Sequence, residues 1–279
     1  MNADSSPEAL EYLRKLVYRT SAIVLEESKG YLFQSRLLPI LRREGLESFD
    51  DLVGRLDAHD AEPLRREVVE AMTTNETSFF RDLHPFEALR RTVLPEIAGQ
   101  RKLAAPAERT LSIWSAACST GQELYSIAFV VRDMAALFSG WTVELLGTDI
   151  SSDVLARAQS GRYSQLEVNR GLPAPMLIRY FTKAGLEWQV SDQVRAMVDF
   201  RAMNLCVPWP RLPLMDVIFL RNVLIYFDND TRTRILERVA RQLRPGGYLF
   251  LGGVESASSL CRRFTEERIG RAVCFRVQP

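Results

Sequence analysis

The first 85 residues carry apolar side chains at the spacing of amphipathic helices. In the earliest segment, Leu10, Leu13 and Val17 recur three and four positions apart. The same spacing continues in four segments, at 8–25, 29–46, 48–60 and 62–74. Gly45 is expected to end the second helix, and Ser48 to cap the start of the third. No strand-like alternation occurs before residue 108, so we predict an all-α domain over residues 1–85.

The pattern changes after a helix at 84–100 and an alanine-rich linker at 99–109. Strands are expected in the segments 110–117, 141–150, 197–205, 215–227, 248–253 and 271–278. Helical patterns separate most of them, which is typical of βαβ units and a mainly parallel sheet. Residues 86–279 are therefore predicted to form one α/β domain. Residues 172–200 exceed what a crossover needs, and EWQVSDQVRAMV alternates like a hairpin, so we expect a small β insertion there.

Composition and charge restrict the function only loosely. The chain has 279 residues with a net charge of +1, which gives no overall attraction to nucleic acid or to a membrane surface. The four cysteines are widely spaced and there are only two histidines, so we expect no metal site. The scattered cysteines are typical of a reducing compartment. The chain contains no apolar run near the roughly 20 residues of a membrane span, and its N-terminus has no signal-peptide pattern. We therefore expect a cytoplasmic protein.

Small residues end the first predicted strand, where ligands bind in parallel sheets. The run from Ser115 through Ala116 to Gly121 lets a ligand approach the backbone, although many α/β proteins have such a turn. It is not the G-x-G-x-x-G of a dinucleotide site, and no P-loop pattern is present. The next helix opens with Gln122 and Glu123, and an acid there argues against phosphate and for a cationic ligand.

Polar residues also end the other strands. Asp149 suits a ribose diol, or alternatively caps the following helix. Asn204 and Leu205 could frame an adenine ring, and Arg221 and Asn222 are costly to bury without partners. Ribose, adenine and amino-acid contacts without a phosphate cradle fit S-adenosylmethionine better than a dinucleotide or ATP.

The stretch TTNETSFFRD at 73–82 places polar groups beside two phenylalanines. By itself it fits either a polar helix boundary or half of a ligand site.

Several segments together resemble a known family, the chemotaxis receptor glutamate methyltransferases, or CheR family. The resemblance rests on TTNETSFFRD, WSAACSTGQELYSIA, GTDIS, SGRY, NL and FLRNVLIYFD, in this order, and extends to RAVCFRV near the end. It implies an α/β class I S-adenosylmethionine-dependent methyltransferase. Such a protein has a Rossmann-like, mostly parallel sheet with an antiparallel last strand, preceded by a small all-α domain.

The resemblance also implies roles for individual residues. The 73–82 segment would link the two domains and fold over the cofactor, with Arg81 near its carboxylate and Phe79 and Phe80 serving as packing. Tyr226 would face the methyl group and the acceptor, and Tyr226 and Arg81 are the implied catalytic residues. The implied cofactor-binding residues are Asn75, Thr77, Arg81, Ala116, Glu123, Asp149, Asn204, Leu205, Arg221 and Asn222.

The implied reaction is O-methylation of glutamates on the cytoplasmic helices of a chemoreceptor. A glutamate with a pKa near 4.3 is already ionised at neutral pH, so no general base is required. His59 and His84 accordingly lie outside the strand-end residues. Arg36, Arg42 and Arg43 share one side of a helix, either as an ordinary solvated face or, as the resemblance implies, for docking on the acidic receptor bundle.

Two departures from the family pattern matter. This chain has Gln122-Glu123 where the family often has two acids, and we expect only the second to be essential. The loop in FTKAGLEWQVSDQVRAMV is short and lacks a glycine-rich tip, which predicts an enzyme independent of a C-terminal pentapeptide tether.

Other functions stay open or are disfavoured. The alternative is a cofactor-binding or receptor-binding regulator without useful turnover. A nucleic-acid or small-molecule methyltransferase is disfavoured, because [DN]-P-P-[YFW] is absent and the charge is near neutral. We expect a monomer whose partner is the receptor bundle, with no nucleic-acid partner and no membrane insertion.

Overall fold

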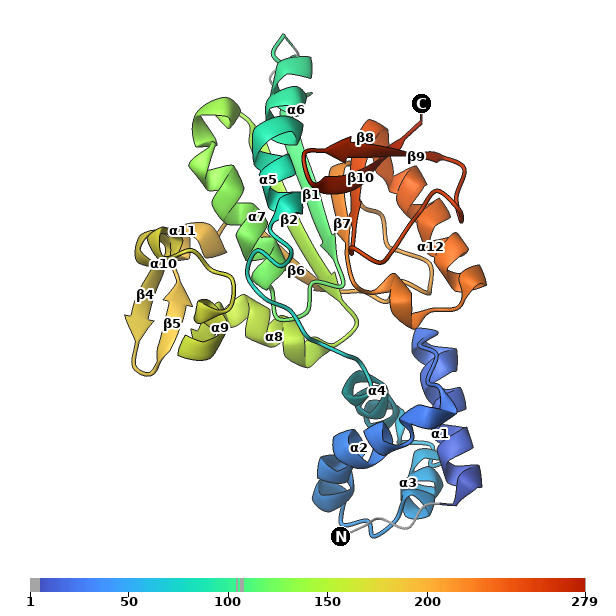
Figure 1. The fold of residues 1–279 in the computed structure, drawn as a ribbon. Helices are drawn as coiled ribbons and strands as arrows, with labels where there is room; N and C mark the ends of the chain where they lie inside the picture. The colour runs from blue at the N-terminus through green and yellow to red at the C-terminus, as the bar shows by residue number, and fades with distance from the viewer. Residues whose placement is uncertain (1–5, 104, 106–107, 279) are drawn as a thin grey trace. The chain divides into compact units, whose positions relative to one another are not determined.

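The computed structural model describes residues 6–103, 105 and 108–278, which divide into two compact units (Figure 1). One unit runs up to Thr74 and includes Tyr226–Thr231, and the other comprises Asn75–Ile225 and the chain from Arg232 onward. The division after Thr74 precedes the position expected from the sequence. Residues 75–85 lie in the larger unit because Phe79 and Phe80 are buried in its core.

The smaller unit is helical, as its apolar spacing predicted. Its elements are α1 (Pro7–Ser21), η1 (Glu27–Lys29), α2 (Tyr31–Glu44), α3 (Phe49–Leu56) and α4 (Glu62–Ala71). Leu13, Phe33 and Leu52 are fully buried. Ser48 forms a capping box with Asp51, and Gly45 ends α2 in the left-handed conformation at φ 69°, which confirms both predicted helix boundaries.

The larger unit is built on a seven-stranded sheet in the order β6-β2-β1-β7-β8-β10-β9. Its strands are β1 (Thr110–Ala116), β2 (Thr142–Asp149), β6 (Val198–Ala202), β7 (Met215–Leu220), β8 (Leu243–Leu251), β9 (Phe264–Ile269) and β10 (Ala272–Val277). The first five strands in the order are parallel, and β10 is antiparallel to both of its neighbours. The predicted fold class is confirmed.

In the main sheet, sequence patterning missed one strand, β9. Four of its six residues are Thr265, Glu266, Glu267 and Arg268, and only Phe264 is buried. An edge strand has one neighbour and solvates much of its surface, so it lacks the hydrophobic signal that identified the other strands.

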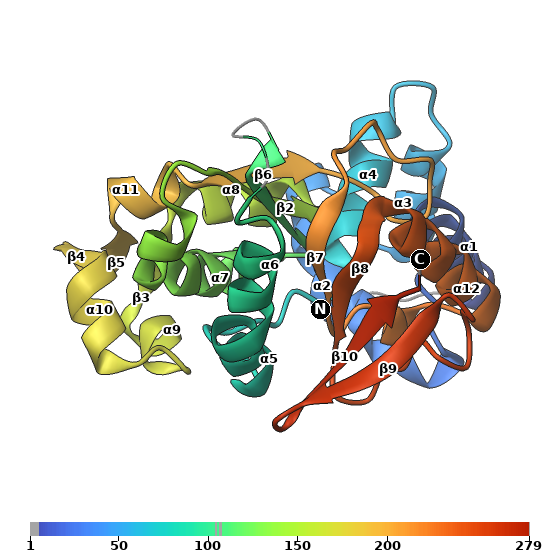
Figure 2. The same cartoon turned by 90° about the horizontal axis from the view of Figure 1, so that it is seen from above.

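Helices cover both faces of the sheet. They are α5 (His84–Ala88), the π-helical η2 (Leu89–Val93), α6 (Leu94–Gln100), α7 (Gln122–Asp133), η4 (Ala135–Phe138), α8 (Ser152–Ser160) and α12 (Asn229–Gln242). The short helix η5 (Leu224–Tyr226) follows β7. Figure 2 shows α5, α6 and α7 on one side of the sheet and α12 on the other. Residues 104, 106 and 107 of the expected linker lie outside the described residues.

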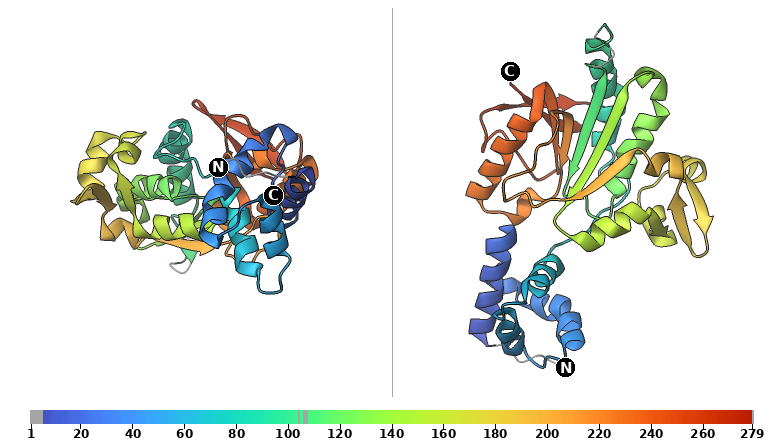
Figure 3. Two further views of the ribbon diagram at one scale, coloured as in Figure 1. Left: turned by 90° about the horizontal axis from the view of Figure 1, so that it is seen from below. Right: turned by 180° about the vertical axis from the view of Figure 1, so that it is seen from behind.

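The small β insertion is present but differs from the expected one (Figure 3). Its sheet has the order β3-β5-β4, with β3 (Arg162–Ser164), β4 (Phe181–Ala184) and β5 (Glu187–Val190), and it carries α9 (Gln165–Asn169), α10 (Ala174–Tyr180) and α11 (Asp192–Arg195). The hairpin is 181–190, not 187–198, because 192–195 is helical and 198–202 belongs to the main sheet. The third strand, β3, precedes the expected insertion.

None of the helices in the described part of the chain is sufficiently long and apolar to cross a membrane.

Candidate cofactor site

The sheet order places a topological switch point at β1. β2, the next strand in the chain, lies on one side of β1, and β7 lies on the other, so the direction of the strand order reverses at β1. Ligands bind beyond the carboxyl ends of the strands at such switch points. The turn after β1 is sharply wound, with left-handed φ values at Ala117 (59°), Ser119 (50°) and Gly121 (91°). A Cβ at Gly121 would lie 2.9 Å from the Ala158 Cβ, so glycine also permits close packing of α7 on α8.

Asp149 lies at the end of β2 with its carboxylate held by backbone groups. The side chain is largely buried, its Oδ2 accepts a hydrogen bond from Ser119 N (2.8 Å) and its Oδ1 accepts one from Ser151 N (3.1 Å). The contact with Ser151 N steadies the N-cap residue of α8, and the carboxylate lies at the strand end where a ribose was expected. Met203 N donates to Asp149 O (2.8 Å), which brings Asn204 and Leu205 beside it.

Arg221, directly after β7, and Glu123, in the first turn of α7, form a buried ion pair. The Arg221 side chain is 1% exposed and donates to Glu123 Oε2 (2.9 Å), Asp82 Oδ2 (2.6 Å) and Arg81 O (2.9 Å). Ser115 Oγ donates to the other oxygen of Glu123 (2.8 Å). The Nε–H of Arg221 is buried and has no hydrogen-bond partner among the described residues. Such a donor is suited to a ligand carboxylate.

The segment 73–82 is irregular and is fixed to this cluster. Ser119 Oγ donates to Asn75 O (2.8 Å), and Phe80 N donates to Ser126 Oγ (2.9 Å). A Cβ at Gly171 (φ 91°) would lie 2.1 Å from Phe79 O, so only glycine allows this close approach of the insertion. Phe79 and Phe80 are buried, which confirms that they pack. Residues 75–82 thus belong to the strand-end cluster.

Most of the predicted cofactor residues converge, and sequence reasoning missed several that join them. Hydrogen bonds link the segments of Asn75, Arg81, Glu123, Asp149 and Arg221. Ala116 ends β1 in the core, and Thr77 is half-buried. The hydrogen bonds of the Ser115, Ser119 and Asp82 side chains that connect them were not predicted, because a serine or an aspartate carries no signal until its partner is known.

Tyr226 belongs to the helical unit. Its carbonyl oxygen accepts a hydrogen bond from Val24 N (2.9 Å), and two residues later Asp228 Oδ2 accepts one from Tyr18 Oη (2.8 Å). Asp228 Oδ1 also accepts from Thr231 N (2.8 Å), at the start of α12. The segment 226–231 is therefore held by α1 and the chain that follows it.

The three arginines predicted to dock on a receptor differ in their surroundings. Arg36 donates to Met72 O (2.7 Å), Thr73 O (2.9 Å) and Thr74 Oγ1 (3.0 Å), so it anchors the end of α4 instead of projecting freely. Arg43 pairs with Glu67 and Glu44. The Arg42 side chain is exposed and makes no hydrogen bond or ion pair with any described residue.

Cys118 lies within the strand-end turn but is unsuited to nucleophilic chemistry. Its thiol is buried, and burial together with the nearby Asp149 and Glu123 carboxylates raises its pKa well above the usual value. A thiol that stays protonated is unreactive.

We therefore expect iodoacetamide at pH 8 to modify the half-buried Cys206 first and Cys118 only in urea. Mass spectrometry of the alkylated peptides would measure this order. If Cys118 in the folded protein were labelled as fast as Cys206, its thiol could not be buried as the structure shows.

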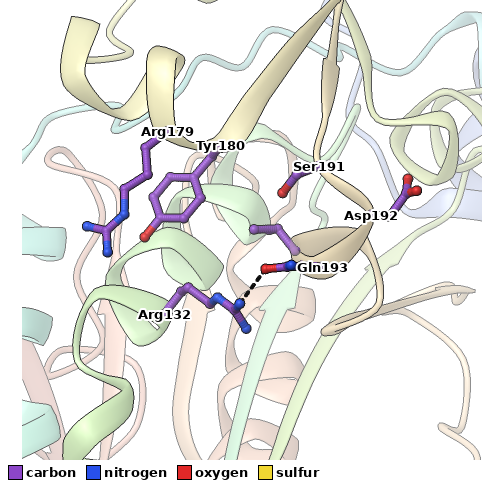
Figure 4. Close-up of a pocket in the computed structure, with 7 residues that line it drawn as sticks. Arg132, Arg179, Tyr180, Ser191, Asp192 and Gln193 are labelled. Atoms are coloured by element: carbon purple, nitrogen blue, oxygen red, sulfur yellow. Dashed lines mark hydrogen bonds between the residues drawn. The ribbon is translucent and has the colours of Figure 1, made fainter.

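A separate cavity of about 480 Å³ lies between α7 and the insertion (Figure 4). Its lining includes Arg132 and Arg179, whose guanidinium groups bond to Gln193 (2.5 Å) and to Asp133 (2.6 Å). None of the predicted site residues lines it. In the described part of the chain, no group of three or more His, Cys, Asp or Glu side chains is arranged to hold a metal ion.

The polar groups at the strand ends together fit one cofactor class. It offers a fixed carboxylate after β2, a buried arginine–glutamate pair with a spare N–H, and a turn without a phosphate-binding glycine pattern. These features and the sheet order are those of an S-adenosylmethionine-dependent methyltransferase. Residues 75–273 match the family described as CheR methyltransferase, SAM binding domain, and residues 8–73 match CheR methyltransferase, all-alpha domain. The chain belongs to the CheR methyltransferase family, and its cofactor is S-adenosylmethionine.

Named relatives agree over nearly the full chain. Chemotaxis protein methyltransferase 1 of Pseudomonas aeruginosa is 39% identical over 272 residues, covering 96% of this chain and 97% of the relative. Chemotaxis protein methyltransferase Cher2 of Pseudomonas putida is 40% identical over 254 residues, with 90% of each chain covered. The chemotaxis protein methyltransferase of Vibrio parahaemolyticus is 38% identical, with 92% of each covered.

Proposed function

We propose that this protein transfers the methyl group of S-adenosylmethionine to glutamate side chains on the cytoplasmic helices of chemoreceptors, forming methyl esters. The similarity to chemotaxis protein methyltransferases supports the receptor as substrate. The observation that carries the proposal is the buried cluster in which Arg221 joins Glu123 and the 73–82 segment at the end of β1.

The proposed cofactor contacts follow from the positions of the residues. Asp149, held by Ser119 N and Ser151 N, would accept from the ribose hydroxyls, and Asn204 and Leu205 would flank the adenine. Glu123 and the Nε–H of Arg221 would bind the ammonium and carboxylate of the methionine part. The remaining proposed contacts come from Asn75, Thr77, Arg81, Ala116 and Asn222.

The proposed reaction needs positioning more than proton transfer. The receptor carboxylate is ionised at neutral pH, so the protein has only to align it with the methyl group and exclude water. We assign Arg81 to orienting carboxylates and Tyr226 to orienting the acceptor. The Arg81 guanidinium donates to Glu76 O (2.9 Å), which limits its motion within the 73–82 segment.

For receptor docking we propose α2, with Arg42 and Arg43 as the attracting charges and Arg36 as a structural residue. Arg36→Ala should lower the free energy of unfolding by about 1.5–3 kcal/mol, because carbonyl oxygens at the end of α4 lose a charged donor. Arg42→Ala should change it by less than about 0.5 kcal/mol. Arg42→Ala should instead slow methylation, most strongly at low salt.

Urea unfolding and initial methylation rates at two salt concentrations would measure these effects. Equal methylation rates for Arg42→Ala and the unaltered protein at both concentrations would exclude Arg42 from docking.

We also propose that the enzyme does not depend on a C-terminal pentapeptide tether on the receptor. The β4–β5 hairpin turns through only Gly185 and Leu186, because Ala184 already pairs with Glu187. A two-residue turn supports this proposal, because it offers little backbone to surround a bound peptide.

Labelled methyl transfer to purified receptor fragments, with and without their C-terminal tails, tests the proposed function. Base-labile label on both versions would support glutamyl ester formation without a tether. Label on the tailed version alone would contradict tether independence. If no fragment is labelled although the cofactor binds, the protein is a cofactor-binding or receptor-binding regulator.

A further inference from the structure

Glu255 lies in the turn that follows β8, and its carboxylate accepts three backbone hydrogen bonds. Oε2 accepts from Asn222 N (2.8 Å) and Gly252 N (2.7 Å), and Oε1 accepts from Ile225 N (3.3 Å). Glu255 N in turn donates to Gly252 O (2.9 Å), which closes the turn. One half-buried side chain therefore joins the loop after β8 to the loop after β7.

The two loops are in direct contact where Glu255 joins them. A Cβ at Gly252 would lie 2.6 Å from Asn222 Nδ2 and 2.9 Å from Asn222 N, so the absence of a side chain allows Asn222 this close. Asn222 has a left-handed backbone (φ 59°), which is uncommon for a residue other than glycine and needs support from its surroundings. The hydrogen bond from its N–H to Glu255 supplies that support.

The conformation of Asn222 bears on the cofactor site because Arg221 directly precedes it. The Arg221 guanidinium holds Glu123, Asp82 and Arg81 O at fixed distances, so the backbone direction at 221–222 has to be defined. Ile225, the third donor, is at the far end of the same loop. Glu255 thus restrains both ends of the segment 222–225.

We propose that Glu255 is a positioning residue that holds the segment 222–225 in the geometry required for S-adenosylmethionine binding. It acts through the backbone of Asn222 and Ile225 and does not itself contact the reacting atoms. The assignment rests on the proposed function for the role of Asn222 as a cofactor contact. Nothing in the sequence singled out Glu255, since a glutamate after a Gly-Gly pair reads as an ordinary surface turn.

The experiment compares Glu255→Ala, Glu255→Gln and, as matched control, Glu266→Ala, which removes an exposed glutamate from the edge strand β9. Binding of S-adenosylhomocysteine is measured by calorimetry, and amide hydrogen exchange is measured without cofactor. Glu255→Ala should raise the Kd roughly 10–100-fold and speed exchange at Asn222 and Ile225 about tenfold or more. Glu255→Gln keeps one accepting oxygen and should raise the Kd only about threefold.

The outcomes separate positioning from general stability. Faster exchange at 222–225 with an unchanged Kd would overturn the proposal, and so would unchanged exchange. The proposal would also be overturned if Glu255→Gln raised the Kd as much as Glu255→Ala does. The same holds if the control Glu266→Ala raised the Kd by a similar factor. If the unaltered protein binds S-adenosylhomocysteine but methylates no receptor fragment, the proposed function fails while the assignment of Glu255 is still tested by these two measurements.

Discussion

Asp149→Ala is expected to weaken the binding of S-adenosylhomocysteine by roughly 100-fold or more. Two charge-assisted hydrogen bonds to a ribose contribute about 1.5–3 kcal/mol each, and each 1.4 kcal/mol is about tenfold in affinity. The substitution also removes the acceptor that fixes Ser119 N and Ser151 N, so the turn after β1 loses part of its support. Calorimetric titration of the purified protein would measure the change.

Two further variants define what Asp149 does, and a third tests Tyr226. Asp149→Asn keeps one accepting oxygen and should lose only about tenfold. Asp199→Ala removes an exposed carboxylate from the neighbouring strand β6 and should leave the Kd unchanged. Tyr226→Phe should reduce the methyl-transfer rate more than cofactor binding. Equal losses of rate and binding would exclude the proposed acceptor role of Tyr226, and normal binding by Asp149→Ala would exclude Asp149 from the cofactor site.

Arg221→Met is expected to have the largest effect on stability, lowering the free energy of unfolding by about 3–5 kcal/mol. The change leaves the Glu123 carboxylate, whose side chain is 11% exposed, without its cationic partner in a buried site. Asp82 is 55% exposed and can be hydrated instead, so Glu123 accounts for most of the loss. The midpoint of thermal unfolding should fall by about 6–20 °C.

A double variant tests that explanation directly. Arg221→Met combined with Glu123→Gln removes the buried charge as well and should recover part of the lost stability. Arg201→Ala breaks only the exposed pair with Asp199 and should cost less than about 1 kcal/mol. A double variant no more stable than Arg221→Met alone would show that the loss comes from packing, for example against Phe86, whose ring lies 5.8 Å from the guanidinium.

The sequence by itself determined the elements that depend on local patterns. Apolar spacing identified α1 to α4, Ser48 and Gly45 marked helix ends, and the strands of the central sheet followed from continuous buried runs such as that of β7. The strand-end residues Glu123, Asp149 and Arg221 were also predictable, because parallel strands bring their carboxyl ends to one edge. The family resemblance rested on the same short segments.

Only the tertiary structure decided the features that depend on a distant partner. Arg36 fits a basic helix face until the end of α4 is seen to accept its hydrogen bonds, and Glu255 acquires a role only when β8 lies beside β7. The β9 strand and the position of the insertion hairpin were likewise hidden, because exposed strands carry no hydrophobic pattern and their pairing is set by neighbours. Local side-chain chemistry fixes which groups are available, whereas contacts between residues far apart in sequence fix which groups meet.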